Sequence, residues 1–422
     1  MERNKNMKDS LRADAEWIVR SAIELVSPAR AVKQALQNRR FPGRVYLVAV
    51  GKAAWEMARA ALEVLPTPVS AGIVVTKYGH VFGSLPGIEC REAGHPVPDA
   101  NTLRATERAL ELTMSLTEED TVLFLLSGGG SALFEKPLVS LEELQDITSQ
   151  LLACGANIQE INTIRKRLSA VKGGRFALHC APARVETILL SDILGDPLDQ
   201  IASGPTIPDG TSCAEAAAVS EKYHLRLSAA ARRCLDQETP KNLVNTAAQV
   251  VGSVGQLCQA AADCCRRRGY KPLLLTDCLD CEAREAGRFL ASIARTQIAA
   301  CSGQKLALLA GGETVVHLHG KGLGGRNQEL ALAAAPGLSG LKGAAVISVG
   351  SDGTDGPTDA AGGYADGETL RRLAAKQWSV DAALANNDAY HALQAVDGLV
   401  ITGPTGTNVN DIAVVLLDGT DS

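Results

Sequence analysis

Three glycine-rich stretches place glycine beside charged or hydroxyl-bearing residues, each directly after an apolar run. The first, Ser127-Gly128-Gly129-Gly130-Ser131, follows TVLFLL. After a strand, consecutive glycines let backbone N–H groups converge without obstruction by Cβ atoms, and a following helix adds its positive N-terminal end. This stretch therefore predicts an anion-binding loop. The alternative is a tight strand-to-helix corner, which needs one glycine rather than three.

The second stretch, HGKGLGGRN, formally matches G-x-G-x-x-G at Gly320, Gly322 and Gly325. This spacing occurs in dinucleotide-binding loops, where an acidic residue about 20 residues later holds the ribose. The sequence has no acidic residue at the end of a second strand at that distance. Lys321 and Arg326 add cationic donors, so a polyphosphate or a carboxylate suits the loop at least as well.

The third stretch, GSDGTDGPTDAAGG, brings Asp352, Asp355 and Asp359 together after the apolar run AAVISV. Turn formation explains one or two aspartates in such a loop, whereas three in a glycine-rich setting suggest a divalent cation. The spacing differs from the calcium-binding loop that ends in a bidentate glutamate. Magnesium, which takes one or two carboxylates together with phosphate oxygens and waters, fits better.

Two further candidates follow apolar runs. Lys52 comes after YLVAVG at the start of a helical pattern, where its ammonium group can reach a ligand at a sheet edge, although an ordinary surface lysine is the alternative. Asp192 follows ETILLS, and its carboxylate could act as a general base or a metal ligand. The same segment offers hydroxyl groups and a tight turn at Ser203, Gly204 and Thr206.

Strand-length apolar runs alternate with helical patterns along the whole chain, which predicts parallel sheets covered by helices on both faces. In such sheets ligands bind at the carboxyl ends of the strands, where the glycine stretches stand. A polar segment at about 238–248 is the best candidate for a linker. We therefore expect two Rossmann-like three-layer α/β/α domains, residues 1–245 and 246–422, with a ligand cleft between them.

The 422 residues carry a formal net charge of -5 with both signs interspersed, which gives no electrostatic footprint for nucleic acid or an anionic membrane. An anionic ligand must therefore be held by local cationic groups. The sequence has no long apolar segment and no signal peptide, so a cytoplasmic protein is expected. The 11 cysteines are scattered singly or in irregular pairs and are expected to be reduced. Cys278 and Cys281 have the spacing of a zinc half-site or a redox pair, but no second pair accompanies them, so a metal site is not expected.

Taken together and in this order, these segments resemble the glycerate 2-kinase family, also described as MOFRL-type kinases. The matching segments are residues 50–58, 93–102, 126–137, 161–175, 189–206, 311–332, 351–363 and 403–412. They span nearly the whole chain, and their common order makes the resemblance specific although each segment alone is weak.

The resemblance implies a two-domain α/β enzyme that uses ATP and Mg²⁺ to phosphorylate D-glycerate at its 2-hydroxyl, giving 2-phosphoglycerate and ADP. The expected partners are D-glycerate and the nucleotide, without nucleic acid or membrane, in a monomer or homodimer. An NAD(P)H-dependent hydroxypyruvate reductase is the alternative, because some members of the family have carried that label and because of the G-x-G-x-x-G pattern. A non-catalytic sensor of sugar acids or nucleotides is a third hypothesis.

The resemblance also implies roles for individual residues. It assigns Lys52 and Arg326 to the glycerate carboxylate or the transferring phosphoryl group, and Asp192 to the general base or to orienting the hydroxyl. Residues 127–131 would form an N–H cradle for a phosphate or a carboxylate. Phosphoryl transfer depends mainly on positioning and charge stabilisation, which groups of this kind supply.

Magnesium and the nucleotide phosphates are assigned by the same resemblance to Asp352 and Asp355, with Glu313 as second choice. Asn408 and Asp411 would close the site, although buried hydrogen bonding explains this pair equally well. The remaining substrate- or phosphate-binding candidates are His95, Ser203, Gly204, Thr206 and Asn327. For His95, a loop histidine that satisfies backbone groups is an equal alternative.

Overall fold

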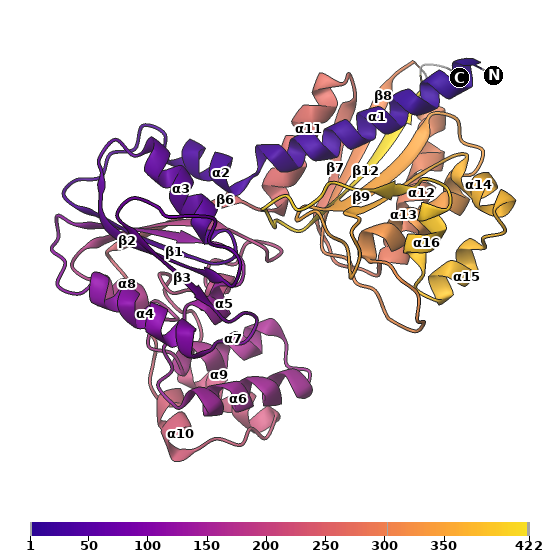
Figure 1. Cartoon of the computed structure of the whole chain (residues 1–422). Helices are drawn as coiled ribbons and strands as arrows, with labels where there is room; N and C mark the ends of the chain where they lie inside the picture. Colours follow the sequence, from indigo (N-terminus) through magenta and orange to yellow (C-terminus); the bar gives the residue numbers. More distant parts are fainter. Residues whose placement is uncertain (1, 302, 420–422) are drawn as a thin grey trace. The chain divides into compact units, whose positions relative to one another are not determined.

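The computed structural model of the chain describes residues 2–301 and 303–419, and these fall into two compact units. The first unit comprises Pro28–Val251. The second comprises the described residues up to Ser27 together with those from Gly252 onward. Each unit has its own six-stranded sheet, so the α/β class expected from the sequence is confirmed (Figure 1).

The first unit contains a doubly wound sheet with the strand order of a dinucleotide-binding fold. In sheet order its strands are β3 (Ile88–Ala93), β2 (Val69–Lys77), β1 (Val45–Val50), β4 (Thr121–Leu126), β5 (Arg184–Leu190) and β6 (Thr246–Gly252). The four pairings among β1 to β5 are parallel. The strand order reverses between β1 and β4, so the loops that follow these two strands flank the usual ligand-binding position.

Helices cover both faces of this sheet. Because successive side chains of a strand point to opposite faces, Val48 and Phe124 pack beneath α4 (Ala100–Leu112) and α8 (Arg175–Cys180). Their neighbours along the strands, which include Leu47 and Leu125, pack beneath α2 (Pro28–Leu36) and α3 (Ala54–Val64). The rings of Phe124, Phe134 and Phe176 lie 5.1 to 5.7 Å apart by their centroids and fill the first of these layers.

A group of helices at one end of the same unit forms a separate small core (Figure 1). Its members are α6 (Leu141–Ala153), α7 (Ile158–Arg167), α9 (Cys213–Lys222) and α10 (Ala229–Leu235). Leu151, Ile164 and Leu168 are fully buried in this core. Two short elements connect the group to the sheet, α5 (Gly130–Leu133) after β4 and the 3₁₀ turn η1 (Ile201–Ser203).

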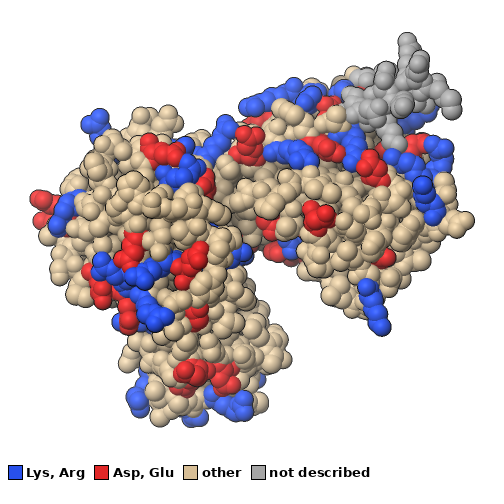
Figure 2. All heavy atoms as spheres, viewed as in Figure 1, with Lys and Arg blue, Asp and Glu red and all other residues tan. Residues whose placement is uncertain are grey.

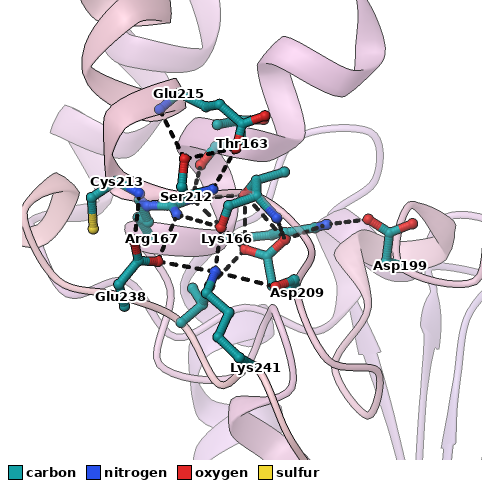
Figure 3. Close-up of polar contacts among 12 residues, drawn as sticks. Thr163, Lys166, Arg167, Asp199, Asp209, Ser212, Cys213, Glu215, Glu238 and Lys241 are labelled. Carbon is teal, nitrogen blue, oxygen red and sulfur yellow. Dashed lines mark hydrogen bonds and ion pairs between the residues drawn. The ribbon is translucent and has the colours of Figure 1, made fainter.

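A network of buried charges fixes the segment after β5 to α7 (Figure 3). Lys166 is fully buried, and its ammonium nitrogen lies 2.7 Å from Asp199 and 3.1 Å from Asp209. Arg167 is equally buried and pairs with Asp209 at 3.7 Å and Glu238 at 3.3 Å. Removing one partner of a buried ion pair is strongly destabilising, so this network holds the segment in one position.

The second unit contains a mixed sheet. In sheet order its strands are β11 (Leu399–Val400), β10 (Gly362–Asp366), β9 (Ala344–Gly350), β12 (Asp411–Asp418), β8 (Lys305–Gly312) and β7 (Lys271–Leu279). β7 and β8 are parallel, whereas the other four pairings are antiparallel. The expectation of parallel strands is therefore wrong for most of this sheet. β12 inserts between β8 and β9, and a strand buried on both faces reads as a continuous apolar run in either direction.

Helices also cover both faces of the second sheet. α12 (Ala283–Ala300) and α13 (Arg326–Leu338) pack against one face through an alanine- and leucine-rich core. α1 (Glu2–Leu25) and α11 (Val254–Arg267) pack against each other and the sheet. Three shorter helices complete the unit, α14 (Thr369–Ala375), α15 (Val380–Ala385) and α16 (Ala389–Gln394).

The limits of the compact units differ from the predicted domains at both ends of the first unit. The predicted boundary after residue 245 falls just before β6, which extends the first sheet, so the chain leaves this unit after Val251. The first 27 residues were predicted to belong to the N-terminal domain, whereas α1 packs in the second unit. An amphipathic helix shows in its sequence that it covers a core, but not which one.

No helix within residues 2–301 and 303–419 is both long enough and apolar enough to cross a bilayer.

Candidate functional site

Lys52 lies just after the end of β1, and its backbone is hydrogen-bonded to the loop that follows β4. The Lys52 N–H donates to the Gly128 carbonyl at 2.9 Å, and the Ala53 N–H donates to the Ser127 hydroxyl at 3.1 Å. Ser127 is buried, and its N–H bonds the Val50 carbonyl at 3.0 Å. Ser127 therefore joins the two loops at the point where the strand order reverses. Its hydroxyl serves the protein rather than a ligand.

Gly128 and Gly129 are surrounded by three of the predicted site residues. Gly129 has a left-handed φ of +85°, and a Cβ there would lie 2.9 Å from the His95 ring and 3.3 Å from Cγ of Lys52. A Cβ on Gly128 would lie 2.2 Å from a carboxylate oxygen of Asp192. These contacts require glycine at both positions. The structure thus brings Lys52, His95 and Asp192 together around one loop.

The electrostatics around Lys52, His95 and Asp192 are dominated by the positive charge of lysine side chains. Within the described residues, no side chain or backbone group forms an ion pair or a hydrogen bond with the Lys52 ammonium nitrogen. The pKa of His95 is lowered by burial first and then by the positive charges of Lys52 and Lys77. His95 is therefore neutral at neutral pH. The loop is lined by one uncompensated cation, a neutral imidazole and the half-buried carboxylate of Asp192.

Ser131 joins the loop to η1. Its hydroxyl lies 3.1 Å from that of Ser203, which in turn donates to Asn162 at 2.8 Å. Ala202 and Ser203 both have left-handed backbones, with φ of 49° and 61°. Non-glycine residues in that conformation cost about 1–3 kcal/mol each and are often found near functional sites. In this conformation the Ser203 hydroxyl lies between the Ser131 hydroxyl and the Asn162 side chain of α7.

Two other candidates in this segment have structural roles. Gly204 has a φ of +59°, and a Cβ there would lie 2.9 Å from the Asp199 carbonyl, so glycine is needed for the turn. The buried Thr206 hydroxyl accepts a hydrogen bond from Thr187 at 2.8 Å, which ties the turn to β5.

In the second unit, Arg326 at the start of α13 is held by two carboxylates. Asp411, at the start of β12, accepts hydrogen bonds from its Nε and Nη2 atoms, the latter at 3.0 Å. Glu313, just after β8, accepts from Nη1 at 2.8 Å. Burial lowers the pKa of Arg326, but its hydrogen bonds and Coulombic attraction to Asp411 and Glu313 outweigh burial and raise the pKa overall. Three of the five guanidinium donors are thus used, and the side chain remains about one-third exposed.

Asp355 and Asn327 are buried within the protein. Asp355 accepts hydrogen bonds from the backbone N–H groups of Asn327 at 3.1 Å and Gln328 at 2.9 Å, so it satisfies donors at the start of α13. The side-chain oxygen Oδ1 of Asn327 accepts a hydrogen bond from the Ser348 hydroxyl at 2.6 Å. Asp352 forms a turn through the N–H of Thr354 at 2.9 Å. These roles explain why aspartate and asparagine recur in this loop.

The predicted magnesium ligands do not form a metal cage. Among the described residues there is no group of three or more His, Cys, Asp or Glu side chains suited to holding a metal ion. Glu313 is engaged by Arg326 and by the Asn410 amide at 3.1 Å, and Asp355 is engaged by backbone donors. A magnesium ion that arrives with nucleotide phosphates needs only one or two protein carboxylates. Asp352, which is half-buried, suits that smaller role.

The loop with the G-x-G-x-x-G pattern packs against the segment 386–388 instead of presenting its N–H groups to a ligand. The N–H groups of Gly320 and Gly322 donate to Asn387 and Asn386 at 2.9 and 2.8 Å, and that of Leu323 donates to Asp388 at 3.1 Å. These glycines are needed because a Cβ on either would lie within 2.4 Å of this segment. With its amides engaged, the loop is a poor site for the pyrophosphate of a dinucleotide.

Asn408 is half-buried in the loop 401–410. Around it, the Val409 N–H donates to the Ser351 hydroxyl at 2.8 Å, and the Ser351 N–H donates to the Asn410 carbonyl at 3.0 Å. Hydrogen bonds therefore join the loop before β12 to the aspartate-rich loop after β9.

A cavity of about 370 Å³ opens beside the glycine loop of the first unit. His95, Gly129 and Ser131 line it together with two residues that the sequence analysis did not single out, Glu135 and Arg165. Neither of these follows a strand or lies in a glycine-rich stretch. Arg165 falls within a segment matching the family pattern, but pattern alone gives its side chain no role.

Outside these sites, basic and acidic side chains are interspersed on the face of the molecule drawn in Figure 2. That face therefore shows no broad basic surface.

These features define a two-domain α/β protein with charged loops at the ends of its strands, a class typical of phosphoryl-transfer enzymes. The chain belongs to the glycerate 2-kinase family. Residues 306–411 match the model of the MOFRL family, and residues 14–236 match that of a domain of unknown function, DUF4147.

Two relatives and one solved structure are similar to the chain over nearly its full length. The chain is 54% identical to a D-glycerate 2-kinase from Thermotoga maritima, over 97% of this chain and 99% of the relative. The crystal structure of a glycerate kinase from the same organism has a TM-score of 0.94 and 53% identity, covering 97% of this chain and all of that one. A protein from Agrobacterium vitis, provisionally named a hydroxypyruvate reductase, is 40% identical over 97% of this chain and 95% of its own length.

Proposed function

We propose that this protein transfers the γ-phosphoryl group of ATP to the 2-hydroxyl of D-glycerate, giving 2-phosphoglycerate and ADP. The observation that carries the proposal is the grouping of Lys52, His95 and Asp192 around Gly128 and Gly129. This grouping lies at the position where the strand order of the sheet reverses, in a chain 54% identical to a D-glycerate 2-kinase.

The residues of the first unit are proposed to act on the acceptor and on the transferring group. Asp192 orients the 2-hydroxyl and accepts its proton as the new bond to phosphorus forms. Lys52 stabilises the negative charge on the oxygens of the transferring phosphoryl group, a role that suits a cation without a protein counter-charge. The neutral imidazole of His95 can donate or accept a hydrogen bond to the substrate without altering this charge balance.

Arg326 is proposed to bind a phosphate of the nucleotide. Asp411 and Glu313 hold the plane of its guanidinium group, and two of its five donors remain for a ligand. Such a preorganised donor loses little conformational freedom when the phosphate binds. We further propose that magnesium enters as the ATP complex and that Asp352 contributes one carboxylate to it. Bound there, the ion would neutralise charge on the phosphate oxygens.

The test is a turnover assay with two arms. Purified protein is incubated with D-glycerate, ATP and MgCl₂, and separately with hydroxypyruvate and NADH or NADPH. We expect ADP formation in the first arm, with a ³¹P NMR spectrum of 2-phosphoglycerate rather than 3-phosphoglycerate. Oxidation of the nicotinamide cofactor in the second arm without ADP formation in the first would establish the reductase instead.

A further inference from the structure

The cavity beside the glycine loop contains an arginine without a protein partner. Arg165 lines this cavity from α7, and within the described residues its guanidinium group forms no hydrogen bond or ion pair. Burial lowers the pKa of Arg165, and the charge of Glu135 offsets this only in part. A half-buried guanidinium group with all five donors available is an unusual arrangement, because buried charges are ordinarily paired.

The neighbours of Arg165 in sequence show that this is a property of its position. Lys166 and Arg167 follow it on α7, are fully buried, and pair with carboxylates in the network of Figure 3. Three consecutive basic residues of one helix point in different directions, and the protein provides carboxylate partners within 4 Å for two of them. The third faces the cavity.

Glu135 lines the same cavity and has one unsatisfied oxygen. Only 2% of its surface is exposed, and its Oε1 atom has no hydrogen-bond partner among the described residues. Its Oε2 atom pairs with Lys172 at 3.2 Å. The fully buried ammonium group of Lys172 also donates to the carbonyls of Ser131 and Phe134, both at 2.8 Å, so its donors are used.

The charge balance of the cavity follows from these contacts. Lys172 compensates Glu135, which leaves the positive charge of Arg165 for a ligand. Arg165 and Glu135 interact electrostatically but do not form an ion pair with each other. A cation and a hydrogen-bond acceptor held apart in one cavity match a ligand that carries both an anionic group and a hydroxyl group.

We propose that this cavity binds the acceptor substrate, with Arg165 holding its carboxylate and Glu135 accepting a hydrogen bond from a hydroxyl that does not react. The inference rests on the proposed function and makes Arg165 a specificity-determining residue for hydroxy acids. A Cβ added at Gly129 would lie 2.9 Å from His95 and 3.3 Å from Lys52, and His95 and Gly129 line the cavity, so a ligand held here lies next to the residues proposed to act in phosphoryl transfer.

This arrangement fixes the substrate at three points. In D-glycerate the carbon that bears the reacting hydroxyl stands between the carboxylate and the carbon that bears the terminal hydroxyl. Holding these two groups at Arg165 and Glu135 leaves the 2-hydroxyl for Asp192 and Lys52. The other enantiomer bound through the same two groups would direct its 2-hydroxyl elsewhere, so we expect the arrangement to select one enantiomer.

The central experiment is the steady-state kinetics of Arg165→Gln with D-glycerate and ATP varied separately. Removing a charged hydrogen-bonding partner that binds substrate and transition state alike raises KM with little change in kcat. We expect the KM for D-glycerate to rise about 10- to 100-fold and the KM for ATP to stay within twofold. Arg165→Lys keeps the charge but loses the planar guanidinium group. Its KM for D-glycerate should lie between those of the wild type and Arg165→Gln.

Arg226→Gln is the matched control, because Arg226 is an exposed arginine in the loop that joins α9 and α10 of the same group of helices. It should leave both KM values unchanged, and circular dichroism should show that all variants are folded. A KM for D-glycerate in Arg165→Gln equal to that of the wild type would overturn the proposal. A rise in the KM for ATP alone would also overturn it, by assigning the cavity to the nucleotide.

A binding measurement separates failure of this inference from failure of the proposed function. Calorimetric titration with D-glycerate requires no turnover. If the wild type binds D-glycerate and Arg165→Gln does not, the cavity assignment holds even where no ADP is formed. Equal binding by both proteins, or no binding by the wild type, would overturn it. For the hydroxyl contact we expect the wild type to prefer D-glycerate to D-lactate by at least about 100-fold, because D-lactate leaves the Glu135 oxygen unsatisfied.

Discussion

Lys52 illustrates how backbone bonds can prepare a side chain for chemistry. Its N–H bonds the carbonyl of Gly128, and the following N–H bonds the hydroxyl of Ser127. These bonds fix the start of the side chain, while its ammonium group has no protein partner among the described residues. A charge that the protein positions but does not neutralise is available to an anion, and this makes Lys52 the first residue to test.

We expect Lys52→Ala to lower kcat about 100-fold or more while the protein stays folded. One preorganised donor directed at developing charge is typically worth about 3 kcal/mol in the transition state. Steady-state kinetics and a thermal melt of the same preparation check this. Lys52→Arg, which keeps the charge, should retain more activity than the alanine variant. An alanine variant with kcat/KM near that of the wild type would exclude Lys52 from the reaction.

Asp411 should make stability depend on pH in a direction opposite to that of an ordinary ion-paired carboxylate. Burial outweighs the attraction of Arg326 and raises the pKa of Asp411 to about 6 from an ordinary value of 3.8. The unfolded chain therefore releases this proton near pH 4, whereas the folded protein holds it until about pH 6. The contribution of Asp411 to the free energy of unfolding thus falls as pH rises through this window.

The measurement compares the wild type with Asp411→Asn, which is neutral at every pH. Between pH 4.5 and pH 7.5 the wild type should lose about 1–3 kcal/mol of unfolding free energy relative to the variant, since each pKa unit corresponds to about 1.4 kcal/mol. Urea denaturation at the two pH values gives this difference. If the difference in unfolding free energy between the two proteins does not change with pH, Asp411 ionises at its ordinary pKa in the folded protein.

At the scale of elements, the loop between β4 and α5 depends on the backbone of Gly129. Its left-handed conformation costs another residue about 1–2 kcal/mol, and a Cβ would also press on His95 and Lys52. The left-handed backbone of Gly129 fits the interpretation as a corner, and the closeness of His95 and Lys52 to this position supports the proposed binding role. The sequence presents these two interpretations as alternatives, whereas in the structure they are compatible.

We expect Gly129→Ala to lower activity at least 10-fold, because displacement of Lys52 by part of an ångström is enough to disturb phosphoryl transfer. Gly155→Ala is the matched control, since Gly155 has a similar φ of +75° but no atom within 4 Å of the added Cβ. Both variants should lose about 1–2 kcal/mol of stability from backbone strain, and Gly129→Ala should lose more because its Cβ also presses on His95 and Lys52. Equal activity in the two variants would mean that the Gly129 contacts are irrelevant to catalysis.

The elements also explain what could be predicted from the sequence. Lys52 and Asp192 follow apolar runs, and the carboxyl ends of parallel strands lie at one edge of a sheet, so their placement at the same edge was predictable. The loop at Gly320 and Gly322 was not, because its glycines are required by the distant segment 386–388. The role of Arg165 could not be predicted either, because the sequence does not show that Arg165 faces the cavity while Lys166 and Arg167 face carboxylates.

For the whole molecule, the most informative difference from the prediction is the position of α1. The chain forms one helix of the second unit, builds the entire first unit, and then returns at Gly252 to complete the second. The second unit is therefore assembled from both ends of the chain. Its core cannot be complete until residues separated by more than 200 positions have met, which increases the entropy that folding must overcome.

This arrangement predicts that a change in α1 destabilises a sheet far from it in sequence. Ile18 is fully buried, and α1 packs against β9 and β12. Ile18→Ala should cost about 2–5 kcal/mol, as for other large buried residues. Hydrogen exchange should show lost protection in β9 and β12, with protection in β1 and β4 unchanged. Glu24→Ala is the control, because Glu24 is an exposed residue of the same helix, and it should leave protection unchanged in all four strands. Loss of protection in β1 and β4 instead would mean that α1 belongs to the first unit, as the sequence order alone suggests.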